Sequence, residues 1–238
     1  MGEVRIQEGI FQAYPGFRRG IVFATNIRNQ GASEDLEAML KEAVDRAGES
    51  PIDLKSDPRI LAWTDAHRLF GSNPNKYPPA HAALLKRVQK GGVQIPLINK
   101  VVAIMNYNSI IDATPVGGDD VDRAGDILTL RYATGNEGFS PLGAPDSREH
   151  PQSGEVIYVV EDSGEVMCRR WNWRNGHVTR ITEETTRIIM NIDGLGEDNE
   201  KRTLMTRDRV AKMLRDYCSA EISTGLLSPA QPSLTFPF

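Results

Sequence analysis

The chain has 238 residues, with 28 basic and 32 acidic side chains, so its formal net charge is −4. Apolar residues make up 39 % and charged residues 25 % of the chain, a composition typical of a globular protein and not of a disordered or fibrous one. The negative net charge excludes a protein that attracts nucleic acid through its overall charge, so any polyanion must bind to a local patch.

Membrane and secretory signals are not apparent in the sequence. The longest apolar runs, such as Val101–Met105, are too short to cross a bilayer, and the first residues lack the pattern of a signal peptide. Only two cysteines occur, Cys168 and Cys218, which form neither a disulfide framework nor a cluster of metal ligands. We therefore expect a cytoplasmic protein without a membrane partner.

Common signatures of catalysis and metal binding are also missing. The four histidines are scattered, and there is no Gly-x-Ser-x-Gly sequence and no phosphate-binding Gly-Lys loop. Asp119, Asp120 and Asp122 follow two glycines and could bind a hard cation, but a turn with solvated carboxylates is the favoured interpretation. We expect no cofactor and no metal.

The first half of the chain predicts one strand and then a series of helices. Gly20–Thr25 is a short β-branched and aromatic run, as in a buried strand. Capping residues and helix breakers then predict four helices. Their expected limits are Ser33 to Gly48, Asp57 to Gly71, Pro78 to Gly91, and Ile98 to Ile110.

The second half changes to the period of two residues that is typical of strands. Strands are expected over 127–132 and 188–193, and Asp162-Ser163-Gly164 predicts a hairpin between Val156–Val160 and Glu165–Arg170. Thr206 is expected to cap a last helix. We predict one domain over 1–238, helix-rich over 30–112 and sheet-rich over 113–195, with a C-terminal helix over about 206–218 and an irregular tail over 219–238.

The segment Cys168–Arg174 alternates guanidinium and indole groups, and residues 166–190 hold five arginines against two glutamates. Guanidinium groups bind phosphate and indoles stack on unpaired bases, so this segment is a candidate surface for a single-stranded RNA end. In the alternative interpretation Trp171 and Trp173 share one face of a strand and only cover the edge of a core. Lys86 and Arg87 either suit the end of their helix or contact phosphate.

Four segments carry a resemblance to a known family. From about Phe11 to Asp216 the chain resembles the stand-alone B3/B4 domain proteins, which are similar to the editing module in the beta subunit of bacterial phenylalanyl-tRNA synthetase. The segments are Tyr14–Arg18, Asn73–Arg87, Ile98–Arg123 and Val166–Leu195. Against the synthetase module the match is narrower, and it rests on Val101-Val102-x-x-x-Asn106-Tyr107, Pro115-x-x-x-x-Asp120-x-Asp122-Arg123, and Glu184-Thr185 before Ile188–Asp193.

The resemblance implies an α/β fold, a three-layer β/β/α sandwich of the B3/B4 type, and a pocket that hydrolyses the ester between a wrong amino acid and tRNA. Gly117 stands where the synthetase module usually has a His, and Asp119 stands at a Phe position. Asn191 corresponds to the Glu that reads the hydroxyl of misactivated tyrosine. Because these departures concern the recognition of tyrosine, the amino acid that is removed stays open.

The expected site follows from the resemblance. Its catalytic residues are Asn106, Gly117 and Gly118, since the glycines would let backbone amides approach the ester. The substrate-binding residues are Asn191, Asp120, Trp171, Asn172 and Trp173, and the RNA-binding residues are Arg169, Arg170, Arg174, Lys86 and Arg87. In the alternatives, Asn106 only makes a buried hydrogen bond, and Gly117-Gly118 is only a tight turn.

Three functions remain in view. The first is a trans-acting aminoacyl-tRNA deacylase, whose partners are the acceptor end of tRNA and the amino-acid moiety, and whose positioned water needs no serine or cysteine nucleophile. The second is a non-catalytic tRNA- or amino-acid-binding module with the same fold. The third is a pocket for a metabolite. The deciding feature is whether the basic aromatic segment borders the same cleft as Asn106 and Gly117.

Overall fold

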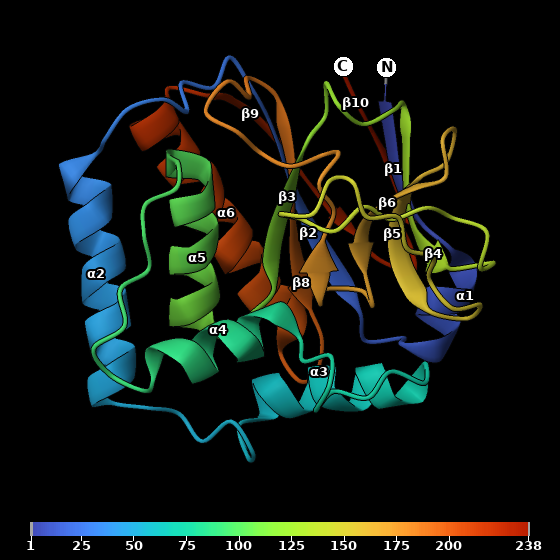
Figure 1. Ribbon diagram of the computed structural model, residues 1–238, viewed down its shortest axis with the longest axis horizontal. Coiled ribbons are helices and arrows are strands. Elements are labelled where there is room, and N and C mark those ends of the chain that lie inside the picture. The colour runs from blue at the N-terminus through green and yellow to red at the C-terminus, as the bar shows by residue number, and fades with distance from the viewer. Residues whose placement is uncertain (1, 238) are drawn as a thin grey trace.

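The computed structural model describes residues 2–237, which form two β-sheets and a layer of helices (Figure 1). The larger sheet has six strands in the order β10-β1-β4-β5-β6-β7. All neighbours in it are antiparallel except β1 and β4, which are parallel. The strands are β1 (Gly2–Ile6), β4 (Ile127–Tyr132), β5 (Val156–Val160), β6 (Glu165–Arg169), β7 (Arg174–Asn175) and β10 (Ser233–Phe236).

The smaller sheet has four antiparallel strands in the order β3-β8-β2-β9, so β3 lies at one edge of it. These strands are β2 (Arg18–Thr25), β3 (Val116–Asp120), β8 (Ile188–Gly194) and β9 (Glu221–Leu227). The helices are α1 (Glu8–Ala13), α2 (Glu34–Glu49), α3 (Pro58–Leu69), α4 (Ala80–Val88), α5 (Lys100–Asp112) and α6 (Asn199–Cys218).

The four-stranded sheet is the middle layer of the molecule. Side chains on a strand alternate between its two faces, and β2 is buried on both. Val22 and Ala24 pack against the helices, whereas Ile21 and Phe23 pack against the six-stranded sheet. The helices α2, α5 and α6 lie on the side away from the six-stranded sheet (Figure 1). The fold is therefore a three-layer β/β/α sandwich, as the resemblance implied.

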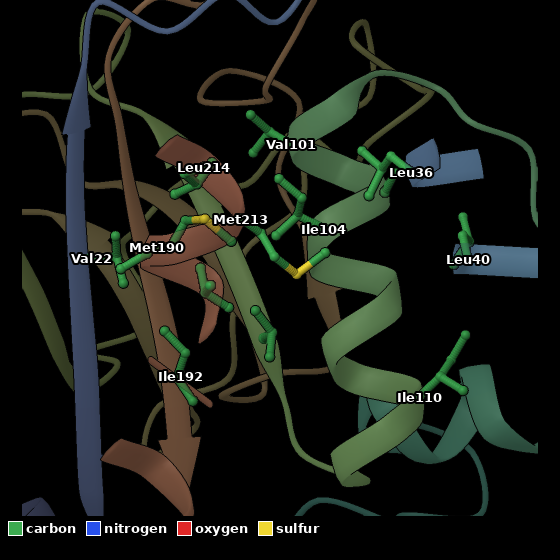
Figure 2. Packing of buried hydrophobic residues seen from close by; sticks show 14 of the residues in the cluster. Val22, Leu36, Leu40, Val101, Ile104, Ile110, Met190, Ile192, Met213 and Leu214 are labelled. Atoms are coloured by element: carbon green, nitrogen blue, oxygen red, sulfur yellow. The ribbon is translucent and has the colours of Figure 1, made fainter. Parts of the chain in front are cut away.

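The helices α2, α5 and α6 share one apolar core with the four-stranded sheet. Val22, Met190 and Ile192 of the sheet meet Met213 and Leu214 of α6, and α5 then packs beside α6 through Val101 and Ile104 (Figure 2). On its far side α5 meets α2 (Figure 2), whose buried Leu36 and Leu40 stand one helical turn apart.

Side-chain caps set the starts of the predicted helices. Ser33 Oγ accepts a hydrogen bond from Leu36 N at 3.4 Å, and Asp57 Oδ1 accepts one from Arg59 N at 2.9 Å. The helix predicted over 98–110 occupies 100–112 instead. Asn99 Oδ1, which accepts from Val102 N at 2.9 Å, places this start.

The C-terminal part differs from the prediction in two respects. Thr206 does not cap α6, which begins seven residues earlier; its hydroxyl donates to Asp112 Oδ2 at 2.6 Å. The tail expected to be irregular contains two strands, since β9 pairs with β2 and β10 pairs with β1. Phe236 also stacks on Phe23 at 5.4 Å, so this tail completes both sheets.

The alternative interpretation of Gly117-Gly118 as a tight turn is wrong, because both residues lie within β3 and neither has a positive φ. Among the described residues, no helix combines the length and the apolar character that crossing a membrane requires.

Candidate functional site

Six polar side chains lie between the two sheets, where the surroundings are otherwise apolar. We call them the inter-sheet polar cluster. The four-stranded sheet contributes residues of β2, β3 and β8, and the six-stranded sheet contributes residues of β5 and β6. The cluster consists of Arg19, Asp119, Tyr158, Cys168, Asn191 and Asp193, all buried.

The centre of the cluster is an ion pair between neighbouring strands. Arg19 Nε and Nη2 donate to Asp193 Oδ1 and Oδ2 at 2.6 and 2.8 Å, and the two residues face each other across β2 and β8. Burial disfavours the guanidinium charge, but the Asp193 carboxylate raises the pKa of Arg19 above its usual value. The pair is therefore charged although Arg19 is only 2 % exposed.

Asp119 lies in the same layer, on β3. Thr179 Oγ1 donates to its Oδ1 at 2.6 Å. Burial raises the pKa of Asp119 to about 6, although Thr179 and Arg19 act in the opposite direction. This carboxyl group therefore changes its protonation state close to physiological pH, as groups at functional sites often do.

Three buried atoms of the cluster have no hydrogen-bond partner among the residues that the structure describes. They are Arg19 Nη1, Tyr158 Oη and Asn191 Oδ1. An unpaired buried polar atom costs about 1–3 kcal/mol of folding free energy, so most such atoms are paired. Arg19 and Asn191 lie on adjacent strands of the smaller sheet and Tyr158 lies on β5 of the larger one, so these atoms mark a candidate place for a polar group from outside the chain.

Gly117 provides space next to this place. It is the cross-strand neighbour of Asn191 and lies on the edge strand β3, where it is only half-buried. A Cβ atom at Gly117 would meet nothing within 4 Å. Because residues opposite each other in an antiparallel pair share a face, this open space adjoins the Asn191 side chain.

The structure thus brings together two of the predicted residues, Gly117 and Asn191, and adds Asp119. Asp120 and Gly118 face the helices instead. Asp120 accepts from Thr185 Oγ1 at 2.7 Å, and a Cβ at Gly118 would lie 3.1 Å from Met190 Cγ. Gly118 therefore serves close packing.

Asn106 does not join this group. It is half-buried on α5, in the helical layer, whereas the Asn191 amide lies beside Tyr158 of the six-stranded sheet. The four-stranded sheet separates the two asparagines.

The prediction of an exposed basic surface at Arg169 and Arg170 is wrong. Both side chains are buried and bind the buried carboxylate of Glu155. Arg169 Nε and Nη2 donate to Glu155 at 2.9 and 2.8 Å, and Arg170 Nη2 lies 3.6 Å from it. Their charges are used inside the protein and are not available to phosphate.

Trp171 and Trp173 do not share one face of a strand. The strand β6 ends at Arg169, and Arg170 and Trp171 have positive φ values, which turn the chain. Trp171 is 1 % exposed and packs edge-on against Tyr14, Phe17 and Trp63, with ring centroids 4.8 to 5.2 Å apart. Trp171 is therefore a core residue, and its burial does not support the predicted role in substrate binding.

The neighbours of Trp171 differ in exposure. Asn172 is buried, and its Oδ1 lies 3.0 Å from Nε2 of His67. Burial lowers the pKa of His67 to about 4, so this contact is internal and uncharged, and a role of Asn172 in substrate binding is not supported.

Trp173 is half-buried against Tyr77, with ring centroids 4.7 Å apart. Arg174 is half-buried and Lys86 and Arg87 are exposed.

Sequence reasoning missed Arg19, Tyr158 and Asp193. Arg19 directly precedes the predicted strand Gly20–Thr25, and Asp193 ends the predicted strand 188–193. The only signal in the sequence was a basic residue at one end of a predicted buried strand and an acidic residue at the end of another. The sequence does not show that these two strand ends lie side by side.

Among residues 2–237, no group of three or more His, Cys, Asp or Glu side chains is arranged to hold a metal ion. A cavity of about 1080 Å³ lies elsewhere, between α2 and the segment 88–97. This cavity is lined by none of the catalytic, substrate-binding or RNA-binding residues that the sequence analysis predicted.

Comparison with known proteins identifies a family and similar solved structures. A family model described as B3/4 domain matches residues 62–219. No curated protein matches the chain. An N-terminal fragment of the phenylalanyl-tRNA synthetase beta-subunit from Pyrococcus horikoshii is similar in structure, with 12 % identity and a TM-score of 0.49. The similarity covers 92 % of this chain and 49 % of that fragment, so this chain spans about half of its length.

The positions of the two tryptophans generate a prediction about stability. Trp171→Ala should lower the free energy of unfolding by about 3–5 kcal/mol, because it empties a buried aromatic site. Trp173→Ala should lower it by about 1 kcal/mol, because this ring loses mainly an edge contact with Tyr77. Urea unfolding measures both. Equal, small losses in the two variants would contradict the burial of Trp171.

Proposed function

The chain belongs to the B3/4 domain family, and we propose that it is a trans-acting aminoacyl-tRNA deacylase. The proposal is supported by the resemblance of the sequence to the stand-alone B3/B4 domain proteins, which are similar to the editing module of the synthetase. The observation that carries it is the set of unpartnered polar atoms at Arg19, Tyr158 and Asn191 beside the open space at Gly117. In this proposal the amino-acid moiety of the substrate enters beside Gly117 and contacts the inter-sheet polar cluster.

The reaction needs a water molecule and no protein nucleophile. Water attacks the carbonyl carbon of the ester, the bond from this carbon to the ribose oxygen breaks, and the products are the amino acid and tRNA with a free hydroxyl. The thiols are unsuitable as nucleophiles, because burial raises the pKa of Cys168 far above its usual value and that of Cys218 to about 11. An aminoacyl ester is reactive enough for a well-oriented water to hydrolyse it.

Asp119 is the residue we assign to the attacking water. It lies two positions from Gly117 on β3, so the two residues share a face of the strand. Thr179 fixes its Oδ1, which leaves Oδ2 to accept a proton from water. A carboxylate with a pKa near 6 is mostly ionised at neutral pH and is still basic enough to serve as a general base.

Of the residues predicted to bind RNA or substrate, those that are exposed or half-buried remain candidates for contact with the RNA. Lys86, Arg87 and Arg174 remain available for phosphate, and Trp173 presents part of its indole. Arg169 and Arg170 are assigned no RNA contact, since Glu155 binds both. Asn106 is assigned no step, because α5 lies on the far side of the four-stranded sheet.

The non-catalytic module is the second candidate. The observation that favours it is the pairing of Arg169 and Arg170 with Glu155, which leaves fewer cations for RNA than the sequence indicated. A protein that binds only a free amino acid would need the inter-sheet polar cluster but not the exposed cations.

The proposal predicts hydrolysis of at least one mischarged tRNA. The measurement is a deacylation panel in which one tRNA carries each of many amino acids, with the uncatalysed rate as the baseline. The activity should persist after treatment with a chelator once the magnesium that folds tRNA is restored. If no ester in the panel is hydrolysed faster than the baseline, the deacylase is excluded and the binding module is favoured.

Asp119→Asn tests the general base. The wild-type rate should rise with pH through about 6 and then level off, because Asp119 must lose its proton to act. The variant should be slower by about a hundredfold to ten-thousandfold and should lack this inflection.

Loss of folding is not expected to confound the result. Burial raises the pKa of Asp119 from 3.8 to about 6, so the folded state loses stability as the pH rises from about 4 to about 6, and this loss stays constant at higher pH. The neutral amide avoids this penalty. An unchanged pH profile in Asp119→Asn would remove Asp119 from the mechanism.

A further inference from the structure

The cavity of about 1080 Å³ lies on the helical side of the molecule, between α2 and the segment 88–97, which leads from the end of α4 towards α5 (Figure 1). We call it the α2 groove. Its lining follows α2 from Glu34 to Glu49 and includes no residue of the inter-sheet polar cluster. At 1.5 Å per residue this stretch of helix is about 22 Å long, which equals the length of about six or seven extended residues.

The wall of the α2 groove opposite α2 is a chain segment with free backbone groups. Val93, Ile95 and Leu97 are half-buried whereas Gln94 and Pro96 are exposed, an alternation typical of an extended strand. Within residues 2–237, no backbone N–H or C=O group of residues 93–97 forms a hydrogen bond. A row of such free groups is what an extended peptide pairs with when it adds a strand.

The interior of the α2 groove is apolar. Among the residues that line it, Leu40, Val44 and Val88 are buried and belong to the apolar core that the helices share with the four-stranded sheet. An occupant of the groove therefore needs apolar side chains that cover these residues.

The charge of the α2 groove comes from α2 alone, since residues 91–97 have no charged side chain. Four acids and Lys41 line the groove, which gives its lining a net charge of −3. Lys41 Nζ lies 2.5 Å from Asp45 Oδ2, so this one base is already paired. Glu34 and Glu37 form no ion pair within residues 2–237 and remain available for a cation.

We propose that the α2 groove binds an extended basic segment of a partner protein. The backbone of the partner segment pairs with residues 93–97, its apolar side chains cover Leu40 and Val44, and its Lys or Arg side chains meet Glu34 and Glu37. Basic and apolar residues alternate in such a segment, because the side chains of a strand alternate between two faces. RNA does not fit, since the acids of the groove repel phosphate. This interaction is independent of the proposed deacylase function.

The charge contacts are tested with a synthetic peptide of alternating Lys and Val, seven residues long and blocked at both ends. Calorimetry on the whole protein measures its Kd. Glu34→Gln combined with Glu37→Gln should weaken binding by about threefold to thirtyfold, because two ion pairs are lost. Glu183→Gln combined with Glu197→Gln is the matched control, since it removes the same charge at two exposed acids outside the groove. Equal weakening in both double variants, or no binding of the peptide to wild type at millimolar concentration, would overturn the proposal.

Hydrogen exchange tests the backbone pairing, which attraction between charges alone does not produce. In the free protein the amides of Val93, Gln94, Ile95 and Leu97 should exchange rapidly, because none of them is hydrogen-bonded within the described chain. Saturation with the Lys-Val peptide should slow at least one of them by more than tenfold. Exchange that stays rapid at all four amides while the peptide is bound would rule out strand addition.

A substitution that fills the α2 groove tests its location. Ala38 is exposed on α2 and lines the groove, so Ala38→Trp should fold and should weaken peptide binding more than tenfold. Ala83→Trp, at an exposed position of α4 outside the groove, is the matched control and should bind the peptide as wild type does. Urea unfolding checks the fold of both variants. Unchanged binding by Ala38→Trp would place the peptide elsewhere and overturn the proposal.

A second copy of this chain is the competing occupant of the α2 groove. Analytical ultracentrifugation of the wild type and of Ala38→Trp distinguishes it from a partner protein. The proposal predicts that both are in the same oligomeric state. A wild-type dimer that dissociates in Ala38→Trp would assign the groove to self-association and contradict the proposal.

Discussion

The buried ion pair between Arg19 and Asp193 is the interaction that the site depends on. Two charges between the sheets are tolerated only because they are paired through two short hydrogen bonds, since removal of one partner from such a pair typically costs about 3–5 kcal/mol. The pair holds β2 and β8 in register at their buried ends. Replacing it by apolar residues would often be neutral for stability. Its presence, with Nη1 of Arg19 left unpaired, supports the proposed role of the cluster in binding.

The position of the cluster in the fold explains how it could be reached. Most of the layer between the sheets is closed by apolar side chains, as the burial of Phe17 and Phe23 shows. The edge strand β3 is the exception, because a glycine stands there at a half-buried position opposite Asn191. A missing side chain at the edge of a sheet gives a ligand access without exposing the rest of the core. The buried carboxyl group of Asp119 lies on the same strand and supplies a titrating group beside this access.

The sequence predicted local features better than long-range ones. Ser33 and Asp57 were correct as helix caps, because a cap is determined by residues two or three positions away. The strands β9 and β10 were missed because most of their side chains are only half-buried or exposed, so they show little apolar alternation. The burial of Arg169, Arg170 and Trp171 could not be predicted from their spacing in the sequence. It depends on a turn with positive φ and on Glu155, which lies 14 residues before Arg169 in the sequence. Of the candidate site, Gly117 and Asn191 were found through the family resemblance, whereas Arg19 and Tyr158 required knowledge of which strands face each other.

The central claim is that the amino-acid moiety of the substrate binds at the inter-sheet polar cluster. A crystal structure of the protein with a non-hydrolysable 3′-aminoacylamino-adenosine tests this claim most directly. The claim predicts that the aminoacyl group lies beside Gly117 and contacts Arg19 and Asn191. Density for the analogue in the cavity between α2 and the segment 88–97, with only water between the sheets, would contradict it.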